Sequence, residues 1–120
     1  MGDQRLRPSE RLRRPSDYQR VFQHGIKLVA PVFVLYVLPT SASRSRLGMA
    51  VSRRVGGAVV RNRVKRRLRE LFRRHKSLLC PACDVVFVAR QGAAEASLEE
   101  YTRQFLMLLH RCQRAGVHQE

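Results

Sequence analysis

The chain has 120 residues, of which 24 are Lys or Arg and 9 are Asp or Glu, so its formal net charge is +15. This length fits one domain, because two smaller cores would each bury too little surface to be stable. A hydrophobic content of 44% excludes a wholly disordered basic tail. No apolar run approaches the roughly 20 residues of a membrane helix, and the polar, Arg-rich start lacks the apolar segment of a secretory signal. We therefore expect a small cytoplasmic domain.

The positive charge is concentrated in the first two thirds of the chain. Residues 1–76 hold 20 basic and 4 acidic groups, whereas residues 77–120 hold 4 basic and 5 acidic groups. Like charges at this density lower the stability of a folded domain unless a polyanion meets them. A membrane surface is one such polyanion, but a helix lying on a membrane also exposes bulky apolar residues, which a protein core can claim here. We therefore predict a nucleic acid partner and no membrane association.

The first part of the chain is predicted to contain an arm, a short helix and strands. Residues 1–14 are expected to form a flexible basic arm, and Ser16 is expected to cap a helix over 17–24 that ends at Gly25. Three strands rich in β-branched and aromatic residues are predicted next, over residues 27–30, 32–38 and 47–52. The second of these strands is apolar at every position, which predicts that both of its faces are covered.

A basic amphipathic helix is predicted to follow. Apolar residues recur with the helical period through the most basic stretch, at Val60, Val64, Leu68, Leu71 and Phe72. The rest of the circumference is polar or basic: Arg61 and Lys65 lie at one edge of the apolar stripe, Arg63, Arg67 and Arg74 at the other, and Asn62, Arg66, Arg69 and Arg73 face away. Gly56 and Gly57 precede the helix and permit a positive φ or a close approach. This helix therefore buries one stripe and presents cations to a partner.

The last third of the chain is predicted to close the core. An apolar strand is expected over 85–89, and Ser97 with Glu100 forms a capping box that opens a helix ending at Gly116. The order of helix, three strands, helix, strand and helix predicts an α/β (α+β) fold, a two-layer sandwich of a small sheet and packed helices. We expect one RNA-binding domain over residues 15–116 and a short tail over 117–120.

The first turns of the basic helix carry the most informative motif. Arg61-Asn62-Arg63 combines guanidinium groups, which bind phosphate bidentately, with an amide that donates and accepts hydrogen bonds. Free backbone N–H groups and the positive helix end also favour phosphate there. With Gly57-Ala58-Val59, Lys65-Arg66 and Arg69-Glu70, this motif resembles the signature of the bacterial ribonuclease P protein subunit. The resemblance continues upstream and covers residues 10–90, through Ser52-Arg53-Arg54, Phe33-Val34-Leu35-Tyr36, Asp17-Tyr18-Gln19-Arg20-Val21-Phe22 and His24-Gly25.

The resemblance implies both a fold and a function. The fold is a four-stranded sheet with three helices and a left-handed crossover around the basic helix. The function is that of a ribonuclease P subunit, which binds a catalytic RNA and the 5′ leader of precursor tRNA while the complex removes that leader. The RNA would hold the catalytic centre and the Mg²⁺, so we expect no catalytic residue and no metal site in the protein, and no obligate protein partner.

The binding residues of the family carry over onto two sets of positions. The set that would bind the catalytic RNA consists of Arg53, Arg54, Arg61, Asn62, Arg63, Lys65, Arg66 and Arg69. The set that would line a cleft for the leader consists of Tyr18, Phe22, Val34 and Tyr36. Aromatic faces stack on unpaired bases of any identity, which suits leaders of varied sequence. Ordinary core packing is the alternative role for Tyr18 and Phe22.

Three other functions are weighed against this one. A ribosomal or RNA-chaperone protein would bind structured RNA with no associated reaction, but it would not need an aromatic cleft. A nuclease built from side chains is disfavoured, because the acids are scattered and no catalytic set emerges. Cys80 and Cys83 suggest a zinc site with His75, His110 or Cys112, or a redox pair. However, a second ligand pair with the usual spacing is missing and the pair precedes a strand, so we predict reduced thiols.

Overall fold

The computed structural model describes residues 8–79 and 81–114, and the predicted order of elements is confirmed. The helices are α1 (Pro15–His24), α2 (Ala58–His75) and α3 (Leu98–Arg114). The strands are β1 (Ile26–Val29), β2 (Phe33–Pro39), β3 (Arg46–Ala50) and β4 (Cys83–Ala89). Short 3-10 turns lie at Pro8–Glu10, Lys76–Leu78 and Gln91–Ala94. Within these described ranges, every helix is too short or too polar to cross a membrane.

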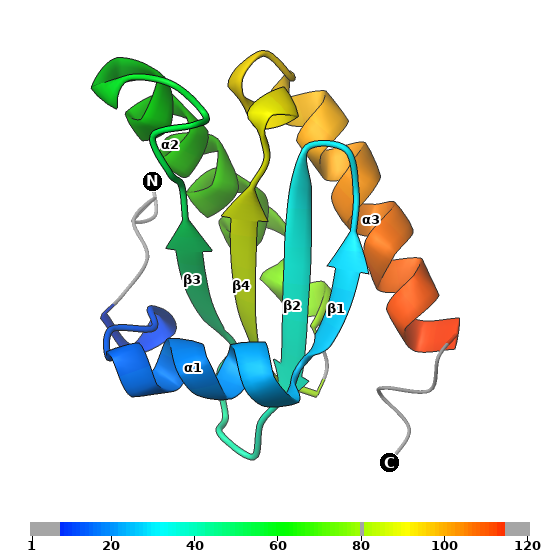
Figure 1. Ribbon diagram of the computed structural model, residues 1–120. Coiled ribbons are helices and arrows are strands. Elements are labelled where there is room, and N and C mark those ends of the chain that lie inside the picture. Colours follow the sequence, from blue (N-terminus) through cyan, green and yellow to red (C-terminus); the bar gives the residue numbers. More distant parts are fainter. Residues whose placement is uncertain (1–7, 80, 115–120) are drawn as a thin grey trace, which may run out of the picture.

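The strands form one mixed sheet in the order β1-β2-β4-β3. β2 is antiparallel to both of its neighbours, whereas β3 runs parallel to β4. Parallel neighbours need a crossover connection, and α2 supplies it. In Figure 1 both strands point upward, β4 lies to the right of β3, and α2 lies behind the sheet, so the crossover is left-handed. The handedness that the family resemblance implied is therefore confirmed, against the general right-handed preference.

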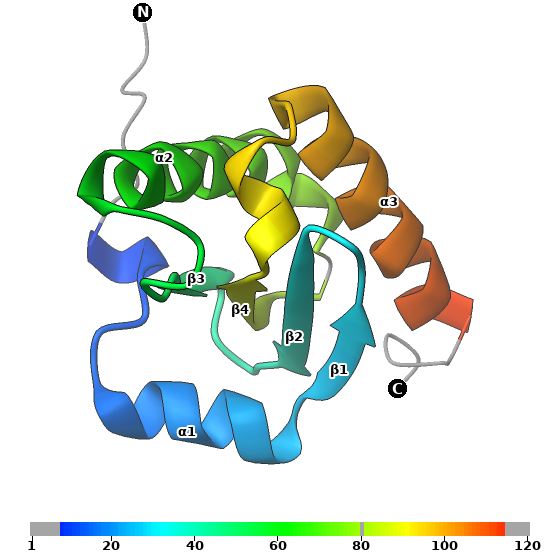
Figure 2. The ribbon, with the colours of Figure 1, turned by 45° about the horizontal axis from the view of Figure 1, so that its top comes forward.

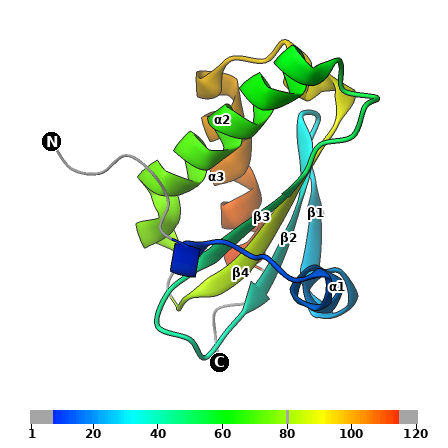
Figure 3. The same cartoon turned by 90° about the vertical axis from the view of Figure 1, so that its left-hand side faces the viewer.

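Helices cover the two faces of the sheet unequally. α2 and α3 lie together over one face, which we call the closed face, and α1 crosses one end of the other, which we call the open face (Figures 1, 2 and 3). The main core lies on the closed face, and its largest side chains are fully buried: Phe33, Leu35, Phe72, Phe87, Tyr101 and Phe105. A small second core under α1 holds Leu12, Val21 and Val86. The predicted packing of a sheet with helices is confirmed, and α1 adds a partial third layer.

Strand β2 shows the difference between the two faces. Phe33, Leu35 and Val37 point into the main core and are 0% exposed. Val34 and Tyr36 alternate with them and are only half-buried, because α1 covers just one end of the open face. The prediction that this apolar strand is covered on both faces is therefore wrong.

The segment before α1 is docked on the sheet edge. The backbone N–H of Leu12 donates to the carbonyl oxygen of Leu47 on β3 at 2.9 Å, and the Leu12 side chain is buried. The buried carboxylate of Glu10 pairs with the ammonium group of Lys76, just after α2. The structure thus differs from the predicted flexible arm over 1–14, because residues 8–12 pack against both β3 and the end of α2. Residues 1–7 lie outside the described part of the chain.

Helix α1 begins earlier than predicted and ends as predicted. Arg14 takes the N-cap position and Pro15 the first helical position, so the predicted cap at Ser16 is wrong. Proline suits that position because its φ is already helical and the N–H that it lacks would have no partner there. At the other end, a Cβ on Gly25 would lie 2.6 Å from the carbonyl oxygen of Val21, so only glycine fits.

Helix α3 begins with half of the predicted capping box. The N–H of Glu100 donates to Ser97 Oγ at 3.0 Å. The Glu100 carboxylate instead pairs with Arg103 and accepts a hydrogen bond from Gln104, so it does not return to the helix start. The predicted helix end at Gly116 and the tail lie outside the described residues.

Candidate nucleic-acid interface

Helix α2 presents its positive end without a cap. Gly57 occupies the N-cap position, so no side chain bonds to the first turn, and that turn contains no acidic residue. Gly56 has a φ of 158°, and a Cβ there would lie 2.8 Å from Val60. Arg53 and Arg54 are exposed in the turn just before. Open backbone N–H groups, the helix dipole and two arginines therefore converge at one place, and this combination favours phosphate.

Three arginines of α2 also brace neighbouring backbone. Nε of Arg61 donates to a carbonyl oxygen of the loop before the helix at 3.1 Å. Arg63 donates to the carbonyl oxygen of Ala94 at 2.9 Å, and Arg67 donates to that of Ala96 at 2.6 Å. The last two bonds tie α2 to the segment that leads into α3. Arg61 and Arg63 of the predicted RNA-binding set thus have a structural role as well.

The other predicted α2 residues lie on the outer side of the helix and toward β3. Asn62 and Arg66 are exposed, with no hydrogen-bond or ion-pair partner among residues 8–79 and 81–114. Lys65 and Arg69 are half-buried, and Arg69 reaches the edge of β3. Burial and the nearby charges of Arg11 and Arg66 lower the pKa of Arg69. Cations that crowd together in this way, without a counter-charge, form a surface that favours an anion.

The end of α2 is partly neutralised. Glu70 pairs with Arg73 at 2.7 Å and also with Arg74. Hydrogen bonds from these two guanidinium groups lower the pKa of the Glu70 carboxyl. The uncompensated positive charge of α2 therefore lies before Glu70, where the predicted RNA-binding residues of this helix are.

Three aromatic rings of the predicted leader set lie in a row on the open face. The ring centroids of Tyr18 and Phe22 are 6.5 Å apart, and those of Phe22 and Tyr36 are 4.9 Å apart in an edge-to-face arrangement. Phe22 is 40% exposed although its side chain is wholly apolar. Val34 lies two residues from Tyr36 on β2 and so points to the same side. The structure brings all four predicted residues onto one surface, which we call the aromatic face.

The strand register adds residues that sequence reasoning missed. Val34 lies opposite Val29 on β1 and opposite Val88 on β4, and Tyr36 lies opposite Lys27. Opposed residues point to the same side of a sheet, so Val29, Val88 and Lys27 extend the aromatic face. Val29 is 46% exposed, which is more than Phe22. Only the pairing of strands reveals these neighbours, because the separate strand sequences do not show which positions meet.

A buried ion-pair network anchors α1 to the sheet. Asp84 on β4 is 1% exposed and accepts two hydrogen bonds from Arg46 on β3, at 2.9 and 2.7 Å. Two residues of α1 join this pair at 3.8 Å: Asp17 contacts Arg46, and Arg20 contacts Asp84. The hydrogen bonding to Asp84 raises the pKa of Arg46. The network therefore fixes the helix that carries two of the three rings.

Tyr18 packs on β3 more closely than Phe22 packs on β2. Its hydroxyl oxygen accepts a hydrogen bond from the backbone N–H of Met49 at 3.2 Å. Its ring lies against Gly48, where a Cβ would come within 2.8 Å of the ring. The packing role that we weighed for Tyr18 is thus present in the structure, and Phe22 is the more accessible ring of the two.

Comparison with known proteins agrees with this geometry. The sequence profile of the family described as Ribonuclease P matches residues 6–113 of the chain. The chain belongs to the ribonuclease P protein family. It is 44% identical over 110 residues to the ribonuclease P protein component of Desulfovibrio desulfuricans, which covers 90% of this chain and 84% of that protein. It is 41% identical over 115 residues to the ribonuclease P protein component of Roseiflexus castenholzii, which covers 95% and 92%.

Solved structures of the ribonuclease P protein family share the fold. The RNase P protein of Staphylococcus aureus superposes with a TM-score of 0.77 at 31% identity, over 87% of this chain and 95% of that one. The RNase P protein from Thermotoga maritima superposes with a TM-score of 0.75 at 33% identity, over 85% and 96%. Membership of this family supports the role of a ribonuclease P subunit and not that of a ribosomal or RNA-chaperone protein.

The cysteines lie apart from both surfaces. Cys83 and Cys112 are buried, and burial raises the pKa of the Cys112 thiol. Cys80 lies outside the described residues. Within residues 8–79 and 81–114, no three His, Cys, Asp or Glu side chains gather in a group that suits a metal ion.

Proposed function

We propose that this ribonuclease P subunit binds the catalytic RNA through the start of α2 and holds the 5′ leader of precursor tRNA on the aromatic face. The observation that carries this proposal is the presence of two surfaces with different chemistry on one small domain. α2 and α1 lie on opposite sides of the sheet, as Figure 3 shows. One side therefore offers cations to phosphates, and the other offers rings and valines to unpaired bases.

The RNA-binding role of α2 is supported by its charge and its open end. The residues of this proposed site are Arg53, Arg54, Arg61, Asn62, Arg63, Lys65, Arg66 and Arg69. Structured RNA presents closely spaced phosphates, and arginine forms two parallel hydrogen bonds with each of them. The two braced arginines, Arg61 and Arg63, hold the loop and the helix in place, and each of these bonds uses one of the five N–H donors of a guanidinium group. Asn62 and Arg66 are exposed members of the site on α2, and neither has a side-chain bond in the described structure to lose.

The leader-binding role of the aromatic face is supported by exposure. An apolar ring that stays 40% exposed, as Phe22 does, gains a large contact area when a base stacks on it. Stacking is worth about 1–3 kcal/mol per base and tolerates any base identity. Lys27 lies beside these rings and is exposed, so it suits a phosphate of the same strand. Tyr18, Phe22, Val34 and Tyr36 therefore form the proposed leader site.

We place the catalytic centre and its Mg²⁺ in the RNA because the acidic residues that the structure describes form no group that suits a metal. Mg²⁺ prefers free carboxylate oxygens and water. Asp17 and Asp84 share the same two cationic partners, Arg46 and Arg20, so neither is a free carboxylate. The contribution of the protein is then electrostatic and geometric: it neutralises phosphates where two RNAs approach each other and holds the leader strand.

Reconstitution with the cognate catalytic RNA tests the proposed function. At low magnesium, adding the protein is expected to increase cleavage of a precursor tRNA that bears a 5′ leader, because phosphate repulsion limits the RNA alone under these conditions. Unchanged cleavage would show that the proposal is wrong. A mature tRNA serves as the competitor that lacks the leader.

A double variant tests the α2 site. Asn62→Ala with Arg66→Ala is expected to weaken binding to the catalytic RNA on the order of tenfold and to flatten the salt dependence by about 0.7 to 0.9 in log–log slope, since one phosphate contact is lost. Neither side chain has a partner in the described structure, so the fold is expected to persist. Arg111→Ala, an exposed position on α3, removes the same charge and is expected to bind normally. Equal losses in both variants would refute the assignment to α2.

A further inference from the structure

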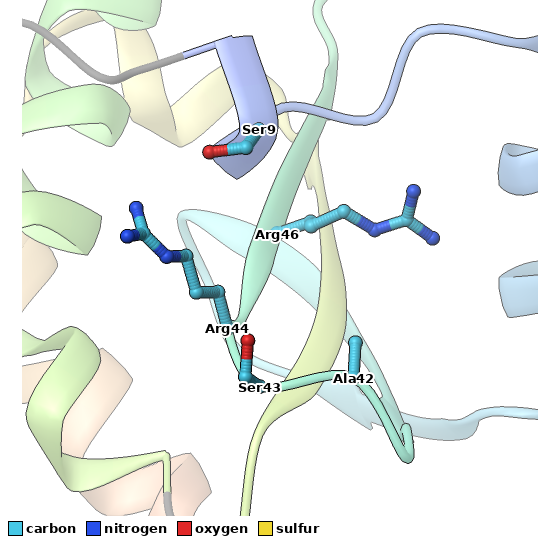
Figure 4. Close-up of a pocket in the computed structure, with 5 residues that line it drawn as sticks. All are labelled: Ser9, Ala42, Ser43, Arg44 and Arg46. Carbon is cyan, nitrogen blue, oxygen red and sulfur yellow. The ribbon is translucent and has the colours of Figure 1, made fainter.

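Three shallow hollows follow one another along the outer edge of β3. The first, of about 90 Å³, lies beside Arg69 and Arg11. The second, of about 270 Å³, is lined by Arg11 and Arg13, and the third, of about 490 Å³, lies beside Arg44 (Figure 4). Arg11 lines both of the first two hollows, and Ser9 lines both of the last two. The hollows therefore form one continuous path from α2 to the loop between β2 and β3.

The path is lined by cations without counter-charges. Arg11, Arg13, Arg44 and Arg69 have no acidic partner among residues 8–79 and 81–114. Arg46 also lines the path, but its guanidinium group is committed to Asp84. Figure 4 shows it pointing away from Arg44. The charges of Arg11 and Arg66 add to burial in lowering the pKa of Arg69, so these groups lie close enough to repel one another.

Arg11 and Arg13 of the path sit on backbone that is already held in place. Leu12, which lies between Arg11 and Arg13, is buried and bonded to Leu47 on β3. The ion pair of Glu10 with Lys76 holds the same segment at its other side. Arg11 and Arg13 alternate along this extended segment and point to the same hollow. Because the segment is ordered before binding, a ligand does not have to order it.

The chemistry of the path fits a row of phosphates. It is open, it is longer than a single anion needs, and its polar lining consists of guanidinium groups and the hydroxyls of Ser9 and Ser43. Hydroxyls and guanidinium groups are common donors to the phosphate oxygens of nucleic acids. A base-reading site would instead need rings, and Tyr18 at the first hollow is the aromatic residue of this lining.

We propose that Arg69, Arg11, Arg13 and Arg44 form a phosphate track along the edge of β3, which holds an RNA backbone that continues from α2 toward the β2–β3 loop. This inference rests on the proposed function, because it takes RNA as the partner. The shared chemistry is a phosphodiester backbone, and its source is either the catalytic RNA or the precursor tRNA. Arg11, Arg13 and Arg44 are the members of the track that lie outside the predicted RNA-binding set.

The test removes the far end of the track. In Arg13→Ala with Arg44→Ala, the fold is expected to persist, because neither side chain has a partner in the described structure. Affinity for the RNA on the track is expected to fall on the order of tenfold or more, and the log–log salt slope to flatten by about 1.4 to 1.8, for two phosphate contacts. The matched control is Arg103→Ala with Arg111→Ala, which removes two exposed charges from α3.

Two binding measurements separate the sources of the RNA. The first is the affinity of each variant for the catalytic RNA alone, and the second is the affinity of the reconstituted complex for precursor tRNA. A loss in the first assigns the track to the catalytic RNA, and a loss in the second alone assigns it to precursor tRNA. Unchanged binding in both, or a loss equal to that of the control, would overturn the track.

The same experiment separates this inference from the proposed function. If the wild-type chain does not bind the catalytic RNA, the proposed function fails, whatever the variants do. If the wild-type chain and the Asn62→Ala, Arg66→Ala variant behave as expected but the track variant binds normally, the track alone fails. The single variant Arg44→Ala controls for a folding defect, because Arg44 lies in a surface loop. It is expected to change the log–log salt slope by about half as much as the double variant.

Discussion

The two faces of the sheet carry similar aromatic residues but are covered by helices to different extents. On the closed face, Phe33 and Phe87 meet edge-to-face at 4.9 Å and are 0% exposed. On the open face, Phe22 and Tyr36 meet at the same centroid distance of 4.9 Å, yet Phe22 is 40% exposed. The geometry of the ring pairs is alike, and the difference lies in what covers them. α2 and α3 close one face, whereas α1 leaves part of the other uncovered.

This difference separates stability from binding within one sheet. Rings on the closed face have already gained the free energy of leaving water, so they hold the fold together. Rings on the open face are still partly in contact with water, so a ligand that covered them would gain the remaining part of that free energy. Substitutions on the two faces are therefore expected to affect different measurements.

Phe87→Ala is expected to have the largest effect, and on stability alone. The ring contacts Phe33 and Phe105 in the main core, with centroids 4.9 and 5.7 Å away, so its removal leaves a cavity. The expected loss in the free energy of unfolding is about 3–5 kcal/mol, measured by urea denaturation. A loss below about 1 kcal/mol would contradict our description of the closed face as the main core.

Asp84→Asn is expected to have the next largest effect, because it breaks the anchor of α1. The variant keeps the shape of the side chain but removes the closer charge partner of Arg46, which then retains the 3.8 Å contact with Asp17. We expect a loss of about 2–3 kcal/mol, at the low end for a buried pair, since Arg46 is 27% exposed and can gain water. Leader affinity is expected to fall as well, because α1 carries Tyr18 and Phe22.

Asp17→Asn is the matched control for the anchor. Asp17 lies in the same network, but its contacts are longer, at 3.3 and 3.8 Å, and it is more exposed than Asp84. A loss well below 1 kcal/mol is expected, as for most partly exposed ion pairs. If both variants lost the same stability, the buried position of Asp84 would not be what anchors α1.

Phe22→Ala is expected to have the smallest effect on stability and a clear effect on binding. Phe22 is already 40% exposed, so the expected loss in the free energy of unfolding is about 1 kcal/mol, from the ring contacts with Tyr36 and Tyr18. Affinity for leader-bearing precursor tRNA is expected to fall about 5- to 150-fold, as for one stacked base, with mature tRNA unaffected. Equal losses for both substrates would refute the leader site.

Leu106→Ala provides a control of the same exposure. Leu106 lies on α3 and is 41% exposed, against 40% for Phe22. It is remote from the aromatic face, so both tRNA affinities are expected to stay unchanged. If Leu106→Ala weakened leader binding, a general loss of exposed apolar area would explain the effect of Phe22→Ala. The proposed role of the open face would then be refuted.

Much of this fold is predictable from local patterns. The apolar repeat from Val60 to Phe72 predicts α2 because a helix needs only residues that are near in sequence. β-branched runs predict the strands for the same reason. The resemblance supplied the left-handed crossover, which no local pattern carries. Sequence reasoning missed the docking of residues 8–12, because it depends on contacts with Leu47 and Lys76, which are distant along the chain.

The candidate site, like the fold, is only partly predictable from the sequence. The residues of the Arg-Asn-Arg motif are evident in the sequence, but their different roles are not. Arg63 and Arg67 donate hydrogen bonds to carbonyl oxygens that lie 31 and 29 positions further along the chain. The side chain of Arg66 has no such partner in the described structure. Helical periodicity places a side chain on a face, but it does not show what backbone lies opposite.

The sequence by itself determined the class of partner, the order of the elements and the helix on which the basic residues gather. Charge and hydrophobic period are local properties, and they survive in any fold that the chain adopts. The tertiary structure alone decided which apolar residues stay open and which arginines stay unpaired. The physical reason is that exposure and pairing depend on neighbours brought together across the sheet. The same apolar strand is fully buried on one face and half-buried on the other.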